Sequence, residues 1–391
     1  MRAITVLCDR VADAGGAERY WETVLPALAS RGVRVRLLAR EIARGPAPGV
    51  AARELRWADD DEPPSPAAAR AVADELRREG PDVVVTASVF DTAVLDAVRA
   101  AGPRWIARVH DHRAFCPTGD RVFPQFEAVC SAPMGGACRR ATIVRGCVHG
   151  PRSSSFRRIA EREGLRDRLA HADCVLVSSE HMRATCIANG IGSARIAITP
   201  PPLPDDAYAA EPAGRPQART LLFASRLTPR KGLRSLLGAL AHLSPSERPH
   251  LVVAGEGDAE ERDARAQAQR DGVGVTWRGR LTAAELRAAI DDADAVAVPS
   301  LWPEPFGLVG IEAQARGRPA VAYRVGGIGD WIGGAGIAVR RGDERALAAA
   351  IGMVLDEPAW SELAATARSH AERYRLGAHV ETLFDIFQGA A

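Results

Sequence analysis

The sequence lacks any apolar stretch long enough to cross a bilayer, and it lacks an excess of either charge. Its 51 basic and 49 acidic side chains give a formal net charge of +2, which offers no electrostatic basis for binding nucleic acid. Lysine is scarce, so nearly all basic side chains are arginine. The first nine residues turn polar too early for a signal peptide. We therefore expect a cytoplasmic protein without integral membrane association or a nucleic-acid partner, and no feature specifies an oligomeric state.

The sequence also lacks closely spaced cysteine pairs. Its seven cysteines, an odd number without a secretory context, indicate a reducing compartment. Cys116, Cys130, Cys138 and Cys147 lie in residues 114–151, a long region without regular patterning that is either functional or locally clamped. Their separations are 14, 8 and 9 residues, whereas structural zinc sites usually contain a close pair. A structural metal, disulfides and unlinked thiols all stay open, and we assign no metal.

Two further features that the sequence lacks argue against a catalytic magnesium ion and against a nicotinamide cofactor. No paired carboxylates stand at predicted strand ends, which argues against catalytic magnesium. Asp59 to Asp61 lie in residues 40–66, a stretch that we interpret as a solvated loop, and Asp291 and Asp292 close a predicted helix. The glycine turn at residues 15–16 lacks the spacing of the dinucleotide fingerprint, which argues against a nicotinamide site.

What the sequence does contain is an alternation of strands and helices that runs twice through its 391 residues. That length favours two domains, and the prolines of residues 200–204 form the best linker. The pattern predicts an α/β protein with two doubly wound, Rossmann-like domains, residues 1–203 and 204–374, facing across a cleft. Residues 375–391 hold a last helix, which we expect to cross back to the first domain. In such sheets, ligands bind at the carboxyl ends of the strands.

The predicted elements follow the apolar periodicity of each block. Strands are predicted at residues 4–8, 33–39, 83–86, 105–109, 174–177, 195–199, 220–224, 250–254, 273–277, 295–298, 320–323 and 336–339. Helices are predicted at residues 17–29, 67–78, 91–101, 155–170, 180–189, 232–241, 260–270, 283–290, 308–316, 344–355, 359–374 and 378–387.

The most informative stretch is residues 299–312, which follows a buried strand. A proline-rich loop leads to Gly307, where a helix begins. The start of a helix presents unbonded N–H groups and a positive dipole end, so it favours an anion. Glu304 and Glu312 bracket this helix start. An anion site between two carboxylates predicts a ligand that is both phosphorylated and rich in hydroxyls, such as a nucleotide sugar.

Basic and glycine residues at other strand ends add to this prediction. Arg226 and Lys231 follow the strand at residues 220–224 and suit a phosphate, although a solvated basic turn is the alternative. Arg230 fits simple solvation better. Gly15 and Gly16 let the backbone approach a ligand.

A histidine stands at the end of a strand in the first domain. His110 follows the strand at residues 105–109 and precedes Asp111, so it can reach the cleft. A structural histidine is the alternative interpretation, and His112 is a second candidate.

These residues together resemble glycosyltransferase family 4, retaining enzymes of the GT-B architecture. The resemblance runs over nearly the whole chain and is strongest in residues 222–327. It rests on E-P-F-G-L-V-G-I-E at residues 304–312, the S-R-L…K-G turn, the A-G-E-G-D loop, the G-R-L segment at residues 279–281 and the Gly326–Gly327 turn.

The resemblance implies a role for each candidate. Glu304, Arg226, Lys231 and His110 would be catalytic. The nucleotide-sugar donor would be bound by Gly15, Gly16, Arg226, Lys231, Gly255, Arg280, Leu281, Glu304, Pro305, Phe306, Gly307, Leu308 and Glu312. The acceptor would bind the first domain, near His110, Asp111 and Arg113. Neither a metal nor a cofactor is implied, because the donor is a co-substrate.

The acceptor is the least specified part of the reaction. We expect a small soluble acceptor, such as an aminocyclitol or another secondary-metabolite precursor, rather than a lipid or polysaccharide of the cell envelope. Two other classes stay open: a phosphorylase- or epimerase-like enzyme, and a non-catalytic nucleotide-sugar-binding protein. A phosphorylase would need a lysine for pyridoxal phosphate, and lysine is scarce here.

Overall fold

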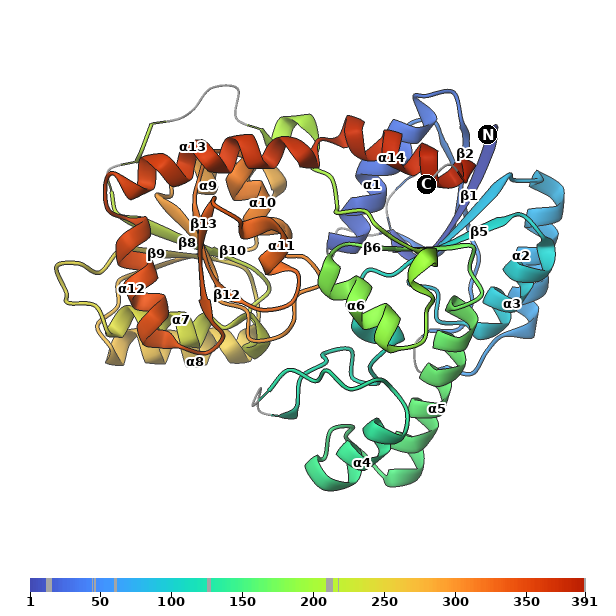
Figure 1. Ribbon diagram of the computed structural model, residues 1–391, viewed down its shortest axis with the longest axis horizontal. Helices are drawn as coiled ribbons and strands as arrows, with labels where there is room; N and C mark the ends of the chain where they lie inside the picture. Colours follow the sequence, from blue (N-terminus) through green and yellow to red (C-terminus); the bar gives the residue numbers. More distant parts are fainter. Residues whose placement is uncertain are drawn as a thin grey trace. The chain divides into compact units, whose positions relative to one another are not determined.

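The computed structural model (Figure 1) describes residues 1–11, 16–43, 45, 47–59, 62–124, 128–208, 214–216 and 218–389, without the side chains of residues 16–18. The chain divides into two compact units. The N-terminal unit comprises Met1–Pro202 and Leu376–Ala391, and the C-terminal unit comprises Leu203–Arg375.

The N-terminal unit is built on a seven-stranded parallel sheet in the order β3-β2-β1-β4-β5-β6-β7. The order reverses direction between β1 and β4, which makes this the switch point where open α/β sheets bind ligands. The strands are β1 (Ala3–Val11), β2 (Arg34–Ile42), β3 (Val50–Glu54), β4 (Val83–Ala87), β5 (Arg104–Arg108), β6 (Cys174–Val177) and β7 (Ile196–Ile198).

Both faces of this sheet are covered, as parallel sheets require. Successive side chains of a strand point to opposite faces, so Val83 and Val85 of β4 join one apolar cluster while Val84 joins another. The helices of this unit are α1 (Gly16–Ala29), α2 (Pro66–Glu79), α3 (Thr92–Ala101), α4 (Gly136–Arg145), α5 (Arg152–Leu169), α6 (Glu180–Ala188) and α14 (Leu376–Gln388).

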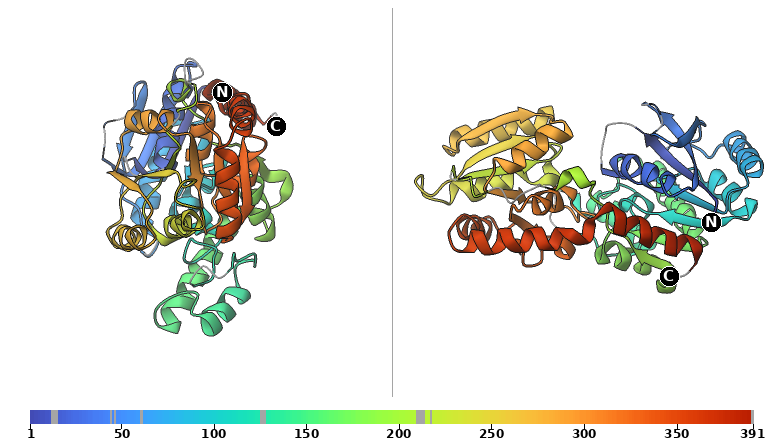
Figure 2. Two further views of the ribbon diagram at one scale, coloured as in Figure 1. Left: turned by 90° about the vertical axis from the view of Figure 1, so that its left-hand side faces the viewer. Right: turned by 90° about the horizontal axis from the view of Figure 1, so that it is seen from above.

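Helix α14 completes the N-terminal unit although it follows the C-terminal unit in sequence. It packs on α1 and buries Val380, Leu383, Ile386 and Phe387 in the same cluster as Ile4 and Val6 of β1. Helix α4 behaves differently. It stands away from the sheet together with the first turns of α5 (Figures 1 and 2).

The C-terminal unit repeats the doubly wound pattern with six parallel strands in the order β10-β9-β8-β11-β12-β13. The switch point lies between β8 and β11. The strands are β8 (Thr220–Ala224), β9 (His250–Ala254), β10 (Val275–Gly279), β11 (Ala295–Val298), β12 (Ala320–Arg324) and β13 (Gly336–Arg340). The helices are α7 (Leu233–Ala241), α8 (Asp258–Arg270), α9 (Ala283–Asp291), α10 (Leu308–Ala315), α11 (Ile328–Ile332), α12 (Glu344–Val354) and α13 (Ala359–Ala371). Figure 1 shows the sheet between a layer of α7, α8 and α12 and a layer of α9, α10 and α13.

The prediction of two Rossmann-like α/β domains is confirmed, but three local predictions were wrong and one short helix was not predicted. Residues 50–54, expected in a loop, form the edge strand β3, which pairing with β2 holds although its side chains are mostly exposed. Residues 136–145 form α4, which has no periodic apolar face because only Thr142 is buried. Residues 328–332 form the short helix α11. Strand β5 ends at Arg108, so Val109 stands between the strand and His110.

Candidate functional site

The candidate site of the C-terminal unit lies at the switch point, where β8 and β11 run side by side. The loop after β8 contains a 3-10 turn, η5 (Pro229–Lys231), and the loop after β11 contains Ser300 and Glu304. Gly232 allows the two loops to meet. It has φ +76°, and a Cβ at this position would stand 1.9 Å from the carbonyl oxygen of Pro299. Only glycine fits this contact, which brings Lys231 against the second loop.

Lys231 and the buried Glu304 form an ion pair at the centre of this site. The Lys231 Nζ stands 2.6 Å from Glu304 Oε1, and the Ser300 hydroxyl donates to the same oxygen at 2.6 Å. Lys231 is the only lysine in the sequence. Burial alone would raise the pKa of Glu304, but the charge and hydrogen bond of Lys231, with the Ser300 hydrogen bond, outweigh burial and lower that pKa. Glu304 is therefore ionised at neutral pH.

The backbone of Glu304 is fixed from the β12 side. Gly326, at φ +59°, packs so closely that a Cβ there would stand 2.3 Å from the carbonyl oxygen of Glu304. The N–H of Gly327 donates to that oxygen at 2.7 Å. Any larger residue at position 326 would displace the loop that carries Glu304.

The start of α10 is held just as firmly. Gly307 is the N-cap, with φ 101°, and no side chain caps the helix. The indole of Trp331 donates to the carbonyl oxygen of Phe306 at 2.6 Å, and its ring fills the space beside Gly310. The first N–H groups of α10 therefore keep a fixed direction and are free of side-chain capping, as an anion site needs. Glu312 is half-buried on this helix.

The ends of β8, β9 and β10 are interlocked by backbone contacts. A Cβ at Gly255 would stand 1.8 Å from the carbonyl oxygen of Ser225, and the N–H of Gly255 donates to the carbonyl oxygen of Gly279 at 2.7 Å. This packing leaves Arg226 and Arg280 exposed at neighbouring strand ends. Leu281 and Pro305 are half-buried.

Sequence reasoning missed several residues of this site. Arg230 was expected to be merely solvated, but its guanidinium carbon lies 4.9 Å from the centroid of the Trp302 ring. Lys231 Nζ lies 5.4 Å from the same centroid. Ser300 and Trp331 were also missed as partners of the loop. The position of Ser300, two residues after a strand, was the available signal.

In the N-terminal unit, His110 stands beside a buried arginine. Arg108 donates to the Thr199 hydroxyl at 2.5 Å and to the Thr199 carbonyl oxygen at 3.1 Å, and its guanidinium carbon lies 3.9 Å from the centroid of the Tyr20 ring. The His110 ring meets the Tyr20 ring edge-on, with 5.4 Å between centroids. Burial, followed by the charges of Arg108 and Arg113, lowers the pKa of His110 well below its ordinary value. His110 is therefore neutral at neutral pH.

Asp111 and Arg113 are engaged with each other. Asp111 accepts from the backbone N–H and from Nε of Arg113, both at 2.8 Å, and so caps the 3-10 turn η1 (His112–Ala114). His112, the second histidine candidate, is fully buried. Its ring meets the ring of His181 edge-on, with 5.4 Å between centroids.

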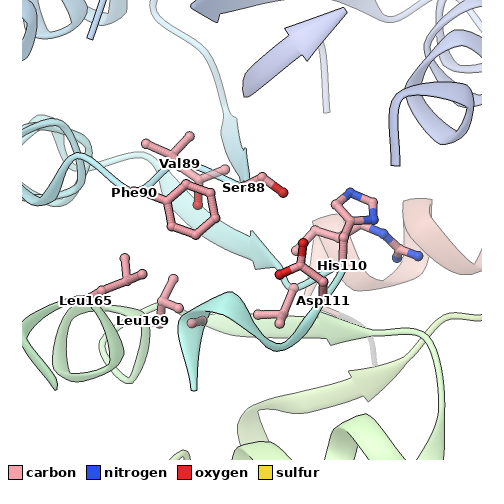
Figure 3. A pocket seen from close by; sticks show the side chains of 11 residues that line it. Ser88, Val89, Phe90, His110, Asp111, Leu165 and Leu169 are labelled. Atoms are coloured by element: carbon pink, nitrogen blue, oxygen red, sulfur yellow. The ribbon is translucent and has the colours of Figure 1, made fainter. Parts of the chain in front are cut away.

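A small cavity lies beside His110 and Asp111, at the ends of β4 and β5 (Figure 3). Ser88 and Phe90 also line it, and its volume is about 30 Å³. That volume holds one or two waters but no sugar. Of the two glycines predicted in the first loop, Gly15 lies outside the described residues, and Gly16 is the first residue of α1.

The structure therefore places the predicted residues in two groups. Arg226, Lys231, Gly255, Arg280, Glu304 and residues 305–312 lie at the strand ends of the C-terminal unit, where Lys231 and Glu304 touch. His110, Asp111 and Arg113 lie in the N-terminal unit. In the described part of the chain, no helix is both long and apolar enough to span a membrane.

Two family models match consecutive parts of the chain. A model described as "Glycosyl transferase 4-like domain" matches residues 15–202, and one described as "Glycosyl transferases group 1" matches residues 218–357.

Curated proteins similar in sequence to this chain are also glycosyltransferases. The glycogen synthase of Mycobacterium tuberculosis is 36% identical over 201 residues, which cover 49% of this chain and 44% of the relative. The chain thus matches less than half the length of that relative. The D-inositol 3-phosphate glycosyltransferase of Acidothermus cellulolyticus is 29% identical over 409 residues, covering 97% of this chain and 86% of the relative.

Solved structures share the fold over the full length. HepE of Anabaena, solved in complex with UDP, has a TM-score of 0.73 at 18% identity and covers 100% of both chains. The sucrose-phosphate synthase of Thermosynechococcus elongatus has a TM-score of 0.73 at 22% identity and covers 100% of this chain and 99% of the other. At these identities the likeness concerns the fold alone.

Proposed function

The chain belongs to the family 4 glycosyltransferases, and we propose that it is a retaining enzyme that moves a hexosyl-type sugar from a UDP- or GDP-sugar to a small soluble acceptor. The observation that carries this proposal is the Lys231–Glu304 pair, 2.6 Å apart beside the uncapped start of α10. Together they supply a cation, an ionised carboxylate and oriented N–H groups at one switch point. A sugar diphosphate needs all three.

The donor would bind along the strand ends of the C-terminal unit. Glu312 would accept hydrogen bonds from the ribose, and Arg280 and Leu281 would lie by the base. The N–H groups at the start of α10 would face the diphosphate. HepE has been solved with UDP and with UDP-glucose, which supports a nucleotide-sugar donor for this chain as well.

Lys231 would change partners when the donor binds. Before binding, it neutralises Glu304, whose side chain is only 7% exposed. Two diphosphate oxygens compete for the same ammonium, so in the complex Lys231 and the exposed Arg226 would both stabilise the leaving group. Glu304 would then accept hydrogen bonds from hydroxyls of the transferred sugar. The Ser300 hydrogen bond keeps its carboxylate in place meanwhile.

The reaction would proceed on one face of the sugar. The anomeric C–O bond to the diphosphate breaks, the leaving nucleoside diphosphate takes the proton of the acceptor hydroxyl, and the new C–O bond forms with retained configuration. In the donor complex Glu304 would keep its Ser300 hydrogen bond and accept from hydroxyls of the transferred sugar, so it would not act as a nucleophile of the kind that retaining glycosidases use. Arginine, lysine and helix N–H groups would carry the positive charge, and the reaction would need no metal. Preorganised donors of this kind contribute about 3 kcal/mol each.

A panel of donors and acceptors tests this proposal. UDP- and GDP-hexoses would be combined with an aminocyclitol, an inositol phosphate, a glucan and a membrane lipid, with product detection by mass spectrometry and anomeric configuration by NMR. We expect a retained product with one soluble acceptor and a fall of about 10²- to 10³-fold in kcat for Glu304→Gln. Glu362→Gln, an exposed glutamate on α13, is the matched control.

Each alternative has its own outcome in this panel. Strong preference for the lipid or the glucan would refute the small soluble acceptor. Donor binding without transfer or hydrolysis would indicate a non-catalytic binding protein. Turnover that survives Glu304→Gln and Arg226→Ala unchanged would refute the site assignment.

A further inference from the structure

Among the described residues of 115–148 in the N-terminal unit, few large apolar side chains are buried: Phe115, Val122, Met134 and Val148. Helix α4 buries only Thr142, and its Ile143 and Val144 are 54% and 74% exposed. Helix α4 stands away from the sheet with the first turns of α5 (Figure 2). Small structures with little core need another source of stability, such as a metal or a disulfide. The described cysteines are all unlinked.

The four cysteines of this segment line a single cavity of about 370 Å³. They come from different local structures. Cys116 follows the turn η1, Cys130 follows the bridge between Val122 and Val129, Cys138 lies in α4, and Cys147 follows the end of that helix. The fold therefore gathers thiols that are 14, 8 and 9 residues apart in sequence.

Backbone N–H groups point at two of these sulfurs. The N–H of Arg121 donates to Cys116 Sγ at 3.4 Å, which closes the turn of residues 116–121. The N–H of Gly135 donates to the Cys138 thiol. Both N–H groups would stabilise the negative charge of a metal-bound thiolate.

The sulfurs also interact with one another electrostatically. Cys116, Cys130 and Cys138 all lie close enough to Cys147 to interact with it electrostatically. Four thiolates around one cavity would repel each other, and a cation among them would remove that repulsion. The other three cysteines of the chain do not line this cavity.

We propose that Cys116, Cys130, Cys138 and Cys147 bind one metal centre through four thiolates, and that this centre clamps residues 115–148. Four thiolates suit a zinc ion or an iron–sulfur cluster. Binding a zinc ion would release four protons, one from each thiol. The centre is structural and takes no part in sugar transfer, so it is independent of the proposed function.

The geometry bears on which of the two metals binds. Within the described residues, no three histidine, cysteine or acidic side chains are gathered closely enough to hold a single ion as they stand. A zinc ion would therefore draw the sulfurs inward, whereas an iron–sulfur cluster spans a larger space and requires less movement. Both would be held by the same four residues.

The test is the metal content of the full chain, purified under reducing, oxygen-free conditions from cells supplied with zinc and iron. Elemental analysis, acid-labile sulfide and visible absorption distinguish the two metals. We expect either about one zinc per chain, or iron with sulfide and charge-transfer absorption. Cys138→Ser and Cys147→Ser should each lower the bound metal at least tenfold. Cys174→Ser in β6 and Cys186→Ser in α6, buried elsewhere in the same unit, are matched controls and should retain it.

Three results would overturn the proposal: metal-free wild-type protein, metal retained in both cavity variants, or disulfides among the four cysteines under these conditions. If a variant does not fold, the wild-type protein still decides. Removal of its metal with a chelator should make four additional thiols reactive, as counted by mass spectrometry after alkylation. An unchanged thiol count would refute the proposal.

Discussion

Several strand ends of the C-terminal unit meet through glycine contacts that exclude a Cβ, whereas strand β5 of the N-terminal unit ends in a network of buried side chains. Gly232, Gly255 and Gly326 each bring two loops within a distance that excludes a Cβ. Around β5, by contrast, Arg108 binds Thr199 and stacks on Tyr20, and Tyr20 in turn bonds His379 of α14 at 2.9 Å. Close backbone contacts require glycine, and those glycines can be recognised in the sequence. A network of buried side chains has no comparable sequence pattern.

This difference bears on how each half would respond to mutation. A glycine lock is disturbed as a whole when one Cβ is added, because the backbone atoms that the Cβ meets can move only if the loop moves with them. A network of buried polar side chains loses one partner at a time. The following predictions probe this contrast, beginning with the largest expected effect.

Lys231→Met should unfold the site and abolish activity. It leaves the buried Glu304 carboxylate without its cation, which costs about 3 kcal/mol of the free energy of unfolding. Adding Glu304→Gln removes the unpaired charge and should restore most of that stability, while activity stays absent. Urea unfolding and donor turnover measure the two effects separately. A double variant as unstable as the single one would show that the ion pair does not hold these loops.

Gly326→Ala should lower activity about 10- to 100-fold and stability by about 2–4 kcal/mol. Its Cβ would clash with the Glu304 backbone, and alanine at φ +59° adds strain. Gly329→Ala is the control, because a Cβ at Gly329 meets no atom within 4 Å. Equal effects of the two substitutions would contradict the lock.

His379→Gln should flatten the pH dependence of stability in mildly acidic solution. Burial, and then the charge of Arg108, lower the pKa of His379 in the folded state from 6.5 to about 3. As the pH falls below 6.5, the unfolded chain takes up this proton first, so stability is lost between about pH 6.5 and 3. The loss is at most about 1.4 kcal/mol per pH unit. Urea unfolding at several pH values measures the slope, and the exposed His242→Gln should leave it unchanged.

Arg108→Met should raise the pKa of His110. The Arg108 charge is the larger of the two charges that lower this pKa, and burial, the first cause, remains. Arg113→Gln should raise it less. NMR titration of the imidazole measures both shifts, and an unchanged pKa in Arg108→Met would show that burial alone keeps His110 neutral.

The same contrast explains which site residues could be predicted from the sequence. Glu304, Lys231 and the helix start at Gly307 were predictable because a parallel sheet brings the ends of its strands together and glycines mark the close approaches. Strand β3 was not predictable, because an edge strand with exposed side chains carries no apolar alternation. Ser300 and Trp331 escaped because their roles depend on tertiary contacts with one carboxylate and one carbonyl oxygen.

In the N-terminal unit, less of the candidate site could be predicted from the sequence. His110 was a candidate by position, but its neutral state depends on Arg108, a residue with no motif of its own. The cysteines carried no recognisable spacing, since the turn, the bridge and the helix that gather them are visible only in three dimensions.

Helix α14 has a consequence for the order in which the chain folds during synthesis. Residues 1–202 leave the ribosome first, yet Val380, Leu383, Ile386 and Phe387 complete their apolar cluster. The C-terminal unit, residues 203–375, is contiguous and needs no later segment for its own sheet. A nascent chain that ends before residue 376 would therefore hold a complete second unit behind a first unit with an uncovered apolar face. The N-terminal unit, whose synthesis begins first, would therefore be the last to complete its apolar core.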